Sequence, residues 1–293
     1  MSVLICEKLT KKSKNSILVD QFSFNFLDNQ IYALVGKNDS GREELLEILA
    51  AQIKPDSGCV WLDGEKLYGN SKMSKRLCYV SNNISFPGHL KIKTIFRLMS
   101  SLYPKWDNAY AYELIDYFNL KKGRSFKSLK ANEKELLSGI LGLASRANIT
   151  ILGTTFESLD IKDRYDFFSF VYSHHTRYPR TFIISTNTVD EIENIINRVL
   201  FFDKGRLFET FTIKELKNNF RLLTGKTEVL KSLISDIKVI GAEERYQNLT
   251  VCVAKKLTKD ETRMFQKYFI KITEVPIQKI FIYFLNLREK KGL

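Results

Sequence analysis

A loop flanked by two glycines is the part of this chain best suited to bind a phosphate group. It follows the apolar run Ile31 to Val35 and precedes the helical run Leu45 to Ile53. In the phosphate-binding motif G-x-x-x-x-G-K-[ST], the lysine reaches the outer phosphates and the hydroxyl holds magnesium. The candidate binding residues of this loop are Gly36, Lys37, Asn38, Asp39, Ser40, Gly41, Arg42, Glu43 and Glu44.

Two side chains that the motif needs are replaced in this loop. Arg42 stands in the lysine position, and Glu43 stands in the Ser or Thr position. A carboxylate beside a triphosphate repels it unless magnesium bridges the two. Arg42 can still hold a phosphate with its two-pronged guanidinium, and the loop amides still point toward the helix start. We therefore expect weak ATP binding with little help from Mg²⁺.

Strand and helix signals alternate through residues 1–211, a pattern typical of a mainly parallel α/β sheet covered by helices. The buried strands are predicted at Ile31–Val35, Leu77–Val80, Ile149–Leu152 and Thr181–Ser185. Short N-terminal strands, antiparallel to one another, are predicted at Val3–Cys6, Phe22–Phe26 and Cys59–Leu62. Residues 91–148 are helical in period and predict an inserted helical subdomain, and residues 199–211 predict a closing hairpin.

A second, smaller α+β unit is predicted over residues 212–293. Its strand signals lie at 222–225, 237–240, 249–253 and 270–273, with helices at 228–235 and 259–269. This order predicts a βαββαβ unit, followed by an amphipathic helix from Pro276. The domain boundary is therefore expected near residue 211.

The composition is that of a globular protein. With 44% hydrophobic residues over 293 positions, the chain can bury an α/β core and a smaller second unit. Four scattered cysteines show no spacing typical of a metal or redox site, and we expect reduced, packed thiols. No apolar run reaches the roughly 18 residues of a membrane span, and the N-terminus lacks a signal-peptide pattern.

The excess of basic residues is concentrated toward the end of the chain. There are 46 Lys or Arg and 33 Asp or Glu, a net charge of +13, and residues 212–293 hold 17 basic and 9 acidic residues. An anionic partner such as nucleic acid or a membrane surface would suit this charge. Since no arginine-rich tract or aromatic-interleaved motif accompanies it, we favour a solvated basic surface near anionic lipid and expect no nucleic-acid partner.

The order of elements resembles the nucleotide-binding subunit of an ATP-binding cassette (ABC) transporter over nearly the whole chain. The segments that carry the resemblance are Lys8–Lys12, Tyr79–Asn82, Ser158–Asp160 and Arg198–Leu207. Residues 103–107 and the C-terminal extension further resemble a bacterial subgroup tied to antimicrobial-peptide and phenol-soluble-modulin export or resistance.

The resemblance implies that several chemical positions are degenerate. Ser13 replaces the aromatic residue that stacks on adenine, and Asn82 replaces the Q-loop glutamine. Gly153 and Thr154 replace the carboxylates that hold magnesium and polarise water, and Asn187 replaces the histidine that contacts the γ-phosphate. His174 and His175 precede their strand, so we expect them to be exposed at its opposite end. Without a general base and a metal carboxylate, autonomous ATP hydrolysis is not expected.

The signature sequence of the family, typically Leu-Ser-Gly-Gly-Gln, reads Leu129, Lys130, Ala131, Asn132, Glu133 in this chain. In the family, each ATP lies between the P-loop of one cassette and the signature of its partner. This chain therefore departs from the pattern on both faces.

Both helix starts that face phosphate in the family carry the spacing of a capping box. In one, Ser40 would accept from the Glu43 amide while the Glu43 carboxylate reaches back, and in the other Asn132 and Glu135 would do the same. These carboxylates would take over the role of the phosphate at the positive helix end. The alternative is that Glu43 and Glu44 point outward into solvent.

Two functions remain open at this point. The first is a catalytically silent cassette subunit of a bacterial ABC exporter of peptides or drugs. It would lie on the cytoplasmic face of the membrane, dock to a permease through residues 82–98 and the helical insert, and pair with a second cassette. The second is a regulatory or structural pseudo-ATPase that stabilises a membrane complex without binding nucleotide. A role on ribosomes is disfavoured, because those relatives carry two cassettes in one chain.

Overall fold

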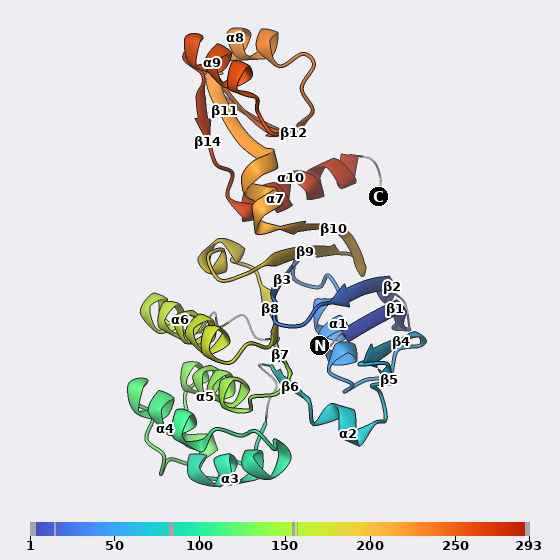
Figure 1. Ribbon diagram of the computed structural model, residues 1–293, viewed down its shortest axis with the longest axis vertical. Coiled ribbons are helices and arrows are strands. Elements are labelled where there is room, and N and C mark those ends of the chain that lie inside the picture. Colours follow the sequence, from blue (N-terminus) through green and yellow to red (C-terminus); the bar gives the residue numbers. More distant parts are fainter. Residues whose placement is uncertain (1–3, 15, 82–84, 154–155, 157, 291–293) are drawn as a thin grey trace. The chain divides into compact units, whose positions relative to one another are not determined.

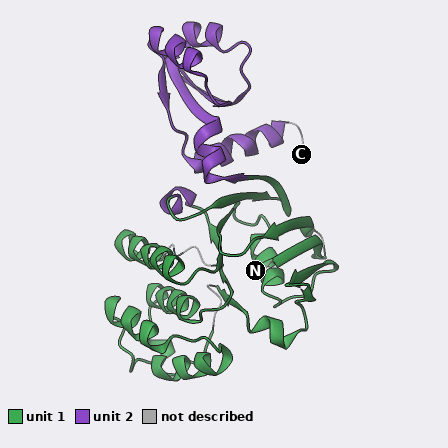
Figure 2. Cartoon of the chain, viewed as in Figure 1, with its two compact units in different colours: residues 1–187, 194–210 green, residues 188–193, 211–293 purple. Residues whose placement is uncertain are grey.

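The chain divides into two compact units in a computed structural model that describes residues 4–14, 16–81, 85–153, 156 and 158–290. The large unit comprises residues 1–187 and 194–210, and the small unit comprises residues 188–193 and 211–293. Figure 2 shows the two units in different colours. The segment 188–193 thus belongs to the small unit, although it lies between two strands of the large one.

The large unit is built on a six-stranded sheet with the order β10-β9-β3-β8-β7-β6 (Figure 1). β3 pairs in parallel with β8 and β9, and β7 pairs in parallel with β8 and β6. The carboxyl ends of these parallel strands therefore meet at one edge of the sheet. The strand bounds are β3 (Ile31–Val35), β6 (Leu77–Val80), β7 (Ile149–Leu152), β8 (Thr181–Thr186), β9 (Arg198–Asp203) and β10 (Arg206–Thr212).

The central strands are apolar runs because both of their faces are covered. Every residue of β3, β7 and β8 is buried. Fully covered parallel strands lack the alternation of half-exposed strands, so they appear in the sequence as continuous Val, Ile and Leu runs. The predicted strands Ile31–Val35, Leu77–Val80 and Ile149–Leu152 have the bounds that the structure gives them.

A second, antiparallel sheet with the order β2-β1-β4-β5 completes the large unit. Helix α1 (Arg42–Leu49) buries Leu45, Leu46, Ile48 and Leu49 in the core cluster that both sheets share. The short helix α2 (Ser71–Ser74) lies between this sheet and β6 in the chain. The strand bounds are β1 (Leu4–Lys12), β2 (Ile17–Phe26), β4 (Ser57–Leu62) and β5 (Glu65–Lys66). The strands β1, β2 and β4 overlap the three predicted N-terminal strands and are longer than them.

Helices occupy the stretch that the sequence predicts as a helical insert. They are α3 (Ile92–Leu102), α4 (Asn108–Tyr117), the 3-10 turn η1 (Phe126–Ser128) and α5 (Ala131–Ala144). After β7 the chain forms α6 (Ile161–Arg177), which returns it to β8. Because α5 and α6 bury Leu137, Ile140, Phe167 and Val171, these helices add to the apolar interior of the large unit.

The small unit contains a four-stranded antiparallel sheet with the order β12-β13-β11-β14. Its backbone also includes the 3-10 turn η2 (Val189–Ile192), where the Asp190 carboxylate accepts from the Gln278 N–H at 3.1 Å. The predicted βαββαβ order and the final helix are present. The bounds are α7 (Ile213–Asn219), β11 (Phe220–Lys226), α8 (Thr227–Leu233), β12 (Val239–Arg245), β13 (Asn248–Ala254), α9 (Lys259–Lys267), β14 (Lys271–Thr273) and α10 (Ile277–Lys290).

Among the described helices, none is both long enough and apolar enough to cross a membrane. The longest of them, α6, has 17 residues and carries charged side chains along its length. The four cysteines are free thiols, and Cys6, Cys78 and Cys252 are buried.

Candidate functional site

The predicted phosphate loop lies at the carboxyl edge of the central sheet and lines a pocket of about 410 Å³. Loop residues 37–42 line it together with Glu43 and Glu44 of α1, Gly153 after β7 and Asn187 after β8. The parallel pairing brings these positions together, because Val35 lies opposite Thr186 and Leu152 opposite Ile184. Asn82 and Thr154, predicted for the same site, lie outside the described residues.

The two glycines of the loop are required by close packing of the backbone. A Cβ on Gly36 would lie 2.4 Å from the carbonyl oxygen of Phe202, and a Cβ on Gly41 would lie 1.8 Å from that of Leu18. Gly41 also has a φ of +88°, a left-handed conformation that favours glycine. The Gly205 N–H donates to the Ser40 carbonyl at 2.8 Å, so the loop is anchored to the β9–β10 turn.

Arg42 lines this pocket, but its guanidinium already has hydrogen-bond acceptors within the protein. Its side chain is buried, and Nη1 donates to the Thr186 carbonyl at 2.9 Å. Nη2 donates to Oδ1 of Asn187 at 2.5 Å. A buried guanidinium must find acceptors for its fixed fork of donors, and the end of β8 supplies them.

Asn187 connects this arginine to the loop. While its Oδ1 accepts from Arg42, its Nδ2 donates to Oδ1 of Asn38 at 3.2 Å. The side chains of Arg42, Asn187 and Asn38 therefore form a continuous hydrogen-bonded chain from the start of α1 to the phosphate loop. The resemblance assigns two of these positions to the lysine and the histidine that contact ATP, and here they bond to each other.

Gly153 lies beneath an aromatic ring. A Cβ at this position would lie 2.6 Å from Cε2 of Tyr79 and 3.0 Å from its hydroxyl oxygen. The parallel pairing of Val80 with Leu152 places the two strand ends side by side, and the Gly153 N–H donates to the Val80 carbonyl at 2.7 Å. The Tyr79 ring thus lies where a Cβ at position 153 would be.

Carboxylates of α1 give this neighbourhood a negative field. Burial raises the pKa of Glu47, and the charges of Glu44 and Glu43 raise it further. Burial also raises the pKa of the Tyr79 hydroxyl, and Glu47 and Glu43 add to this effect. In the part of the chain that the structure describes, no group of three His, Cys, Asp or Glu residues is arranged to hold a metal ion. Glu43 and Glu44 thus place negative charge on the α1 side of the pocket.

The capping box proposed for Ser40 and Glu43 is not formed. Helix α1 begins at Arg42, its N-cap is Gly41, and no side chain caps it. Ser40 Oγ is buried and has no hydrogen-bond partner among the described residues, and Glu43 is exposed. The left-handed turn at Gly41 moves the helix start by one residue and turns Ser40 inward, against Gly36. For Glu43, the structure agrees with the alternative prediction that this side chain points outward into solvent.

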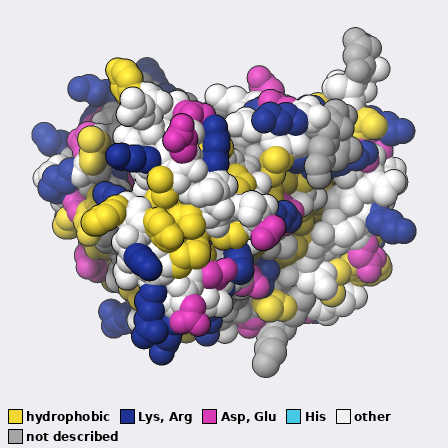
Figure 3. Space-filling view, turned by 90° about the horizontal axis from the view of Figure 1, so that it is seen from above, with side chains coloured by type: hydrophobic (Ala, Val, Ile, Leu, Met, Phe, Trp, Pro, Cys, Tyr) yellow, Lys and Arg dark blue, Asp and Glu magenta, His cyan; other side chains and the backbone are white. Residues whose placement is uncertain are grey.

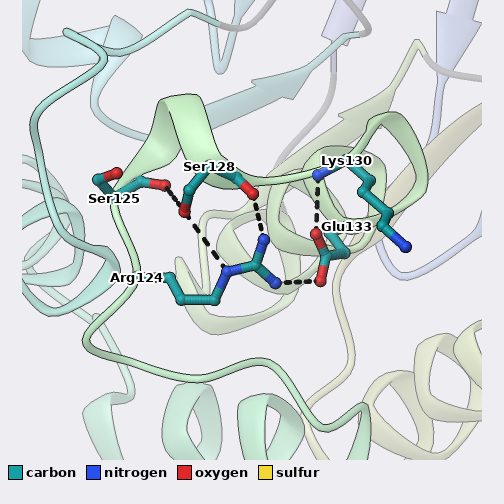
Figure 4. Close-up of polar contacts among 5 residues, drawn as sticks. All are labelled: Arg124, Ser125, Ser128, Lys130 and Glu133. Carbon is teal, nitrogen blue, oxygen red and sulfur yellow. Dashed lines mark hydrogen bonds and ion pairs between the residues drawn. The ribbon is translucent and has the colours of Figure 1, made fainter.

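A carboxylate does close the start of α5, but through other residues than predicted. The helix begins at Ala131 with Lys130 as its N-cap, so Asn132 lies inside the first turn. The Glu133 carboxylate accepts from the Lys130 N–H at 2.7 Å (Figure 4). Glu135 instead accepts from the Ser158 N–H at 3.1 Å and from its hydroxyl at 2.5 Å. The predicted cap at Asn132 and Glu135 is therefore wrong by two residues.

Arg124 holds Glu133 in this position. Its guanidinium pairs with the Glu133 carboxylate and donates to the Ser128 carbonyl, as Figure 4 shows. Burial acts to raise the pKa of Glu133, but the hydrogen bonds from the Lys130 N–H and Arg124 outweigh it and hold this pKa below its usual value. The positive end of α5 is thus already occupied by an ionised side chain.

The segment expected to contact adenine is folded onto a carboxylate. The Lys12 N–H and the Lys11 ammonium donate to the Asp56 side chain at 2.7 and 3.1 Å. The Ser13 N–H donates to the Ser16 carbonyl at 2.8 Å, which closes a turn. Because Ser13 offers no aromatic face, this turn presents no stacking surface of its own.

The two histidines lie away from the pocket, on α6, which precedes β8 in the chain. The expectation that both are exposed is wrong for His174, which is buried against the Tyr110 ring with centroids 4.7 Å apart. Burial, with smaller contributions from Arg180 and Arg146, lowers the pKa of His174 to about 3, so the imidazole is neutral. His175 is half-buried and contacts the Arg180 carbonyl through Nδ1 at 2.9 Å.

Two contributors to the site were missed at the sequence level. Tyr79 could have been found from the pairing of adjacent strands, since it lies one residue before the end of β6 while Gly153 follows β7. Arg124 lies in a turn nine residues before Glu133, and no sequence pattern links the two. Only the tertiary structure brings it to the helix start.

The family model described as "ABC transporter" matches residues 19–152, which include the phosphate loop, α5 and β7. The chain is 23% identical over 213 residues to the ABC transporter ATP-binding protein YtrB of Bacillus subtilis, covering 73% of each chain. It is 24% identical to a probable sulfate/thiosulfate import ATP-binding protein CysA of Chlorella vulgaris, covering 75% of this chain and 94% of the relative.

A solved structure agrees with these sequence matches. The dimeric structure of a bacterial ABC transporter cassette superposes with a TM-score of 0.64 at 15% identity, over 72% of this chain and 98% of the cassette. The large unit has the fold of an ABC-type ATP-binding cassette. This confirms the predicted fold class, a P-loop α/β cassette with a mainly parallel sheet. The residues that depart from the pattern implied by the resemblance lie in the phosphate loop, after β7, after β8 and at the start of α5.

Proposed function

We propose that this chain is a catalytically silent cassette subunit of a bacterial ABC exporter of peptides or drugs. It acts at the cytoplasmic face of the membrane with a permease and a second, competent cassette. The observation that carries this proposal is the bonded chain of Arg42, Asn187 and Asn38. Two groups that would contact ATP in the family are already paired with each other, so nucleotide must compete with protein hydrogen bonds.

The residues at the two positions directly after β7, Gly153 and Thr154, carry no carboxylate in the sequence, which supports the loss of hydrolysis. Phosphoryl transfer depends on a metal to neutralise charge and on a group that orients the attacking water. At Gly153 the Tyr79 ring fills the space beside the backbone. Turnover in the assembled transporter would therefore come from the partner cassette.

The start of α5 supports an asymmetric pair of cassettes. A partner's ATP would face a helix end at which Glu133 already accepts the Lys130 N–H. A carboxylate there repels the γ-phosphate, although Arg124 offsets part of its charge. The composite site formed by this signature region would consequently be the slower of the two, and the other site would set the rate.

The apolar side of α3 supports attachment to a permease. Leu98 and Leu102 are large hydrophobic residues on α3 that are 44% and 52% exposed. Exposed aliphatic side chains on a helix suit a partner surface better than water. They lie at and just beyond the predicted docking region of residues 82–98, of which 82–84 are outside the described residues.

Hydrolysis and nucleotide binding are tested separately on the purified chain. We expect no phosphate release from MgATP above background, and weak ATP binding by calorimetry that does not depend on Mg²⁺. Turnover at the rates of typical enzymes, about 1 s⁻¹ or faster, would overturn the proposal of a silent cassette. Tight, Mg²⁺-dependent binding would likewise reject the pseudo-ATPase alternative.

The role in transport is tested by co-purification from membranes with an affinity-tagged chain. We expect a permease and a second cassette to be recovered, and Leu98→Asp together with Leu102→Asp to abolish their recovery. The matched control is Lys93→Asp together with Arg97→Asp, on other positions of the same helix, which should have a weaker effect. Recovery of the chain without any membrane subunit would contradict the transport proposal.

A further inference from the structure

Two adjoining hollows lie at the amino edge of the central sheet, where residues precede β6, β7 and β8. One has a volume of about 540 Å³ and is lined by the α2 segment and by residues 103–105. The other has a volume of about 640 Å³ and is lined by residues 177–180. Lys105 and residues 146–148 line both hollows, so the two share a wall.

The lining of these hollows is strongly basic. Its cationic side chains are Lys72, Lys75, Arg76, Lys105, Arg146, Arg177 and Arg180. Among the described residues that line the hollows, Asp28 is the single carboxylate. Two further carboxylates act from outside the lining, since Asp63 pairs with Arg76 at 2.6 Å and Asp107 pairs with Arg146. The positive charge of the lining therefore exceeds the negative charge around it.

Arg146, which faces both hollows, is held in place by its neighbours. Its guanidinium carbon lies 3.7 Å from the centre of the Tyr178 ring, and the Asp107 carboxylate fixes one nitrogen. Its Nε is buried and has no hydrogen-bond partner among the described residues. The guanidinium carbon of Arg177 lies 5.3 Å from the centre of the same ring. Side chains ordered before binding lose little conformational entropy when a ligand arrives.

Arg180 brings a buried charge to the wall of the second hollow. Its side chain is only 5% exposed, and Nη2 donates to the carbonyls of Gly142 and Leu143 at 3.2 and 2.9 Å. Its Nε and Nη1 have no hydrogen-bond partner among the described residues. Burial lowers the pKa of Arg180 to about 10, which reflects the cost of keeping this charge out of water. A buried cation of this kind calls for a nearby negative charge.

We propose that the two hollows form one binding site for a small soluble anion that carries two or more phosphate groups. Lys105 and Arg146 line both hollows and would contact both ends of such a ligand. Lys75 in the first hollow and Arg177 in the second would each contact one end. Concave walls can enclose a small ligand, whereas a flat partner surface would not enter the hollows. This site is separate from the phosphate loop, since the two lie at opposite ends of the parallel strands.

Calorimetric titration of the full chain with inorganic pyrophosphate and tripolyphosphate tests this site. We expect both to bind more tightly than orthophosphate, and binding to weaken as NaCl is raised. Lys105→Ala with Arg177→Ala should weaken pyrophosphate binding by about tenfold or more, because two charge-assisted contacts are lost. Both residues are exposed, so the fold should persist, as circular dichroism would verify.

Two controls make the result specific. Lys93→Ala with Arg97→Ala removes the same charge from exposed positions of α3 and should leave the affinity within about twofold. Lys37→Ala in the phosphate loop should also leave it unchanged. The proposal fails if Lys37→Ala abolishes binding, or if the α3 pair weakens it as much as the Lys105 and Arg177 pair. The proposal also fails if the chain binds phosphatidylglycerol vesicles but does not bind pyrophosphate.

Discussion

At the scale of single residues, three substitutions have become part of the protein's own packing. Arg42 and Asn187 bond to each other at the end of β8, and Tyr79 lies against Gly153. Buried polar groups without partners are costly, so these contacts stabilise the folded chain. The altered site is therefore stabilised from within.

Arg42→Ala should lower the free energy of unfolding by about 2 kcal/mol, because it removes the hydrogen bonds from a charged group to Thr186 and Asn187. Urea unfolding followed by circular dichroism measures this change. The control Arg97→Ala, on an exposed position of α3, should stay within about 0.5 kcal/mol of the parent protein. Unchanged stability with a loss of ATP binding would show that Arg42 serves a ligand instead.

Gly153→Asp should not restore a metal site and should cost about 2 kcal/mol of stability, because its Cβ would overlap the Tyr79 ring. Adding Tyr79→Ala should make the combined cost smaller than the sum of the two single changes, which a double-mutant cycle by urea unfolding would measure. Gly123→Asp is the matched control, since a Cβ there meets nothing within 4 Å. Strict additivity of the two changes would contradict this account.

At the scale of elements, the start of a helix decides which side chain can close it. α5 begins at Ala131, so the reciprocal carboxylate is Glu133, two residues before the predicted Glu135. In α1 the left-handed Gly41 serves as the N-cap, and no carboxylate reaches back. A carboxylate of the protein therefore caps the start of α5 but not that of α1, because the backbone conformations at the two helix starts differ.

Glu133→Gln should cost about 1 kcal/mol at neutral pH, because the ionised carboxylate is lost from the helix start. The pKa of Glu133 is lowered in the folded protein, so its contribution is complete above the unfolded pKa of ~4.3 and is lost as pH falls through the folded pKa. The stability difference between the two proteins should therefore shrink on acidification below about pH 4.

Urea unfolding at several pH values measures this difference. Glu113→Gln, an exposed position on α4, is the control and should change stability little at any pH. A Glu133→Gln difference that grows on acidification would reverse the sign of the linkage and contradict the assignment of Glu133 as an ionised cap.

At the scale of the whole molecule, basic residues outnumber acidic ones, with a net charge of +13. In the face shown in Figure 3, Lys and Arg side chains and acidic side chains both lie around a group of hydrophobic ones. Because a basic surface is attracted to anionic lipid, we propose a peripheral position at the membrane.

Removal of residues 211–293 should destabilise the remaining chain, because η2 belongs to the small unit. Val189 and Ile192 are buried there, and the Asp190 side chain accepts from Gln278 of α10. Exposing two aliphatic side chains costs about 3 kcal/mol, which corresponds to a melting temperature lower by roughly 5–10 °C. Differential scanning calorimetry measures the change, and an unaltered melting temperature would show that the segment 188–193 packs independently of α10.

Much of the fold could be predicted because the controlling signals are local. The buried strands at Ile31–Val35 and Ile149–Leu152 follow from continuous apolar runs, and the order of strands and helices indicated the cassette fold. The side-chain geometry of the site could not be predicted in this way. Arg42 finds its acceptor 144 residues further along the chain, at Thr186, and no local pattern indicates which way a buried guanidinium turns.

The sequence by itself determined which chemical groups are present at the site: Arg42, Gly153 and Asn187, where the resemblance implies a lysine, a metal carboxylate and a histidine. These identities do not depend on packing. The tertiary structure alone decided what those groups do, because strand pairing brings Tyr79 onto Gly153 and the end of β8 onto Arg42. Side-chain partners are set by which strand ends meet and by where each helix begins, and both are properties of the folded chain.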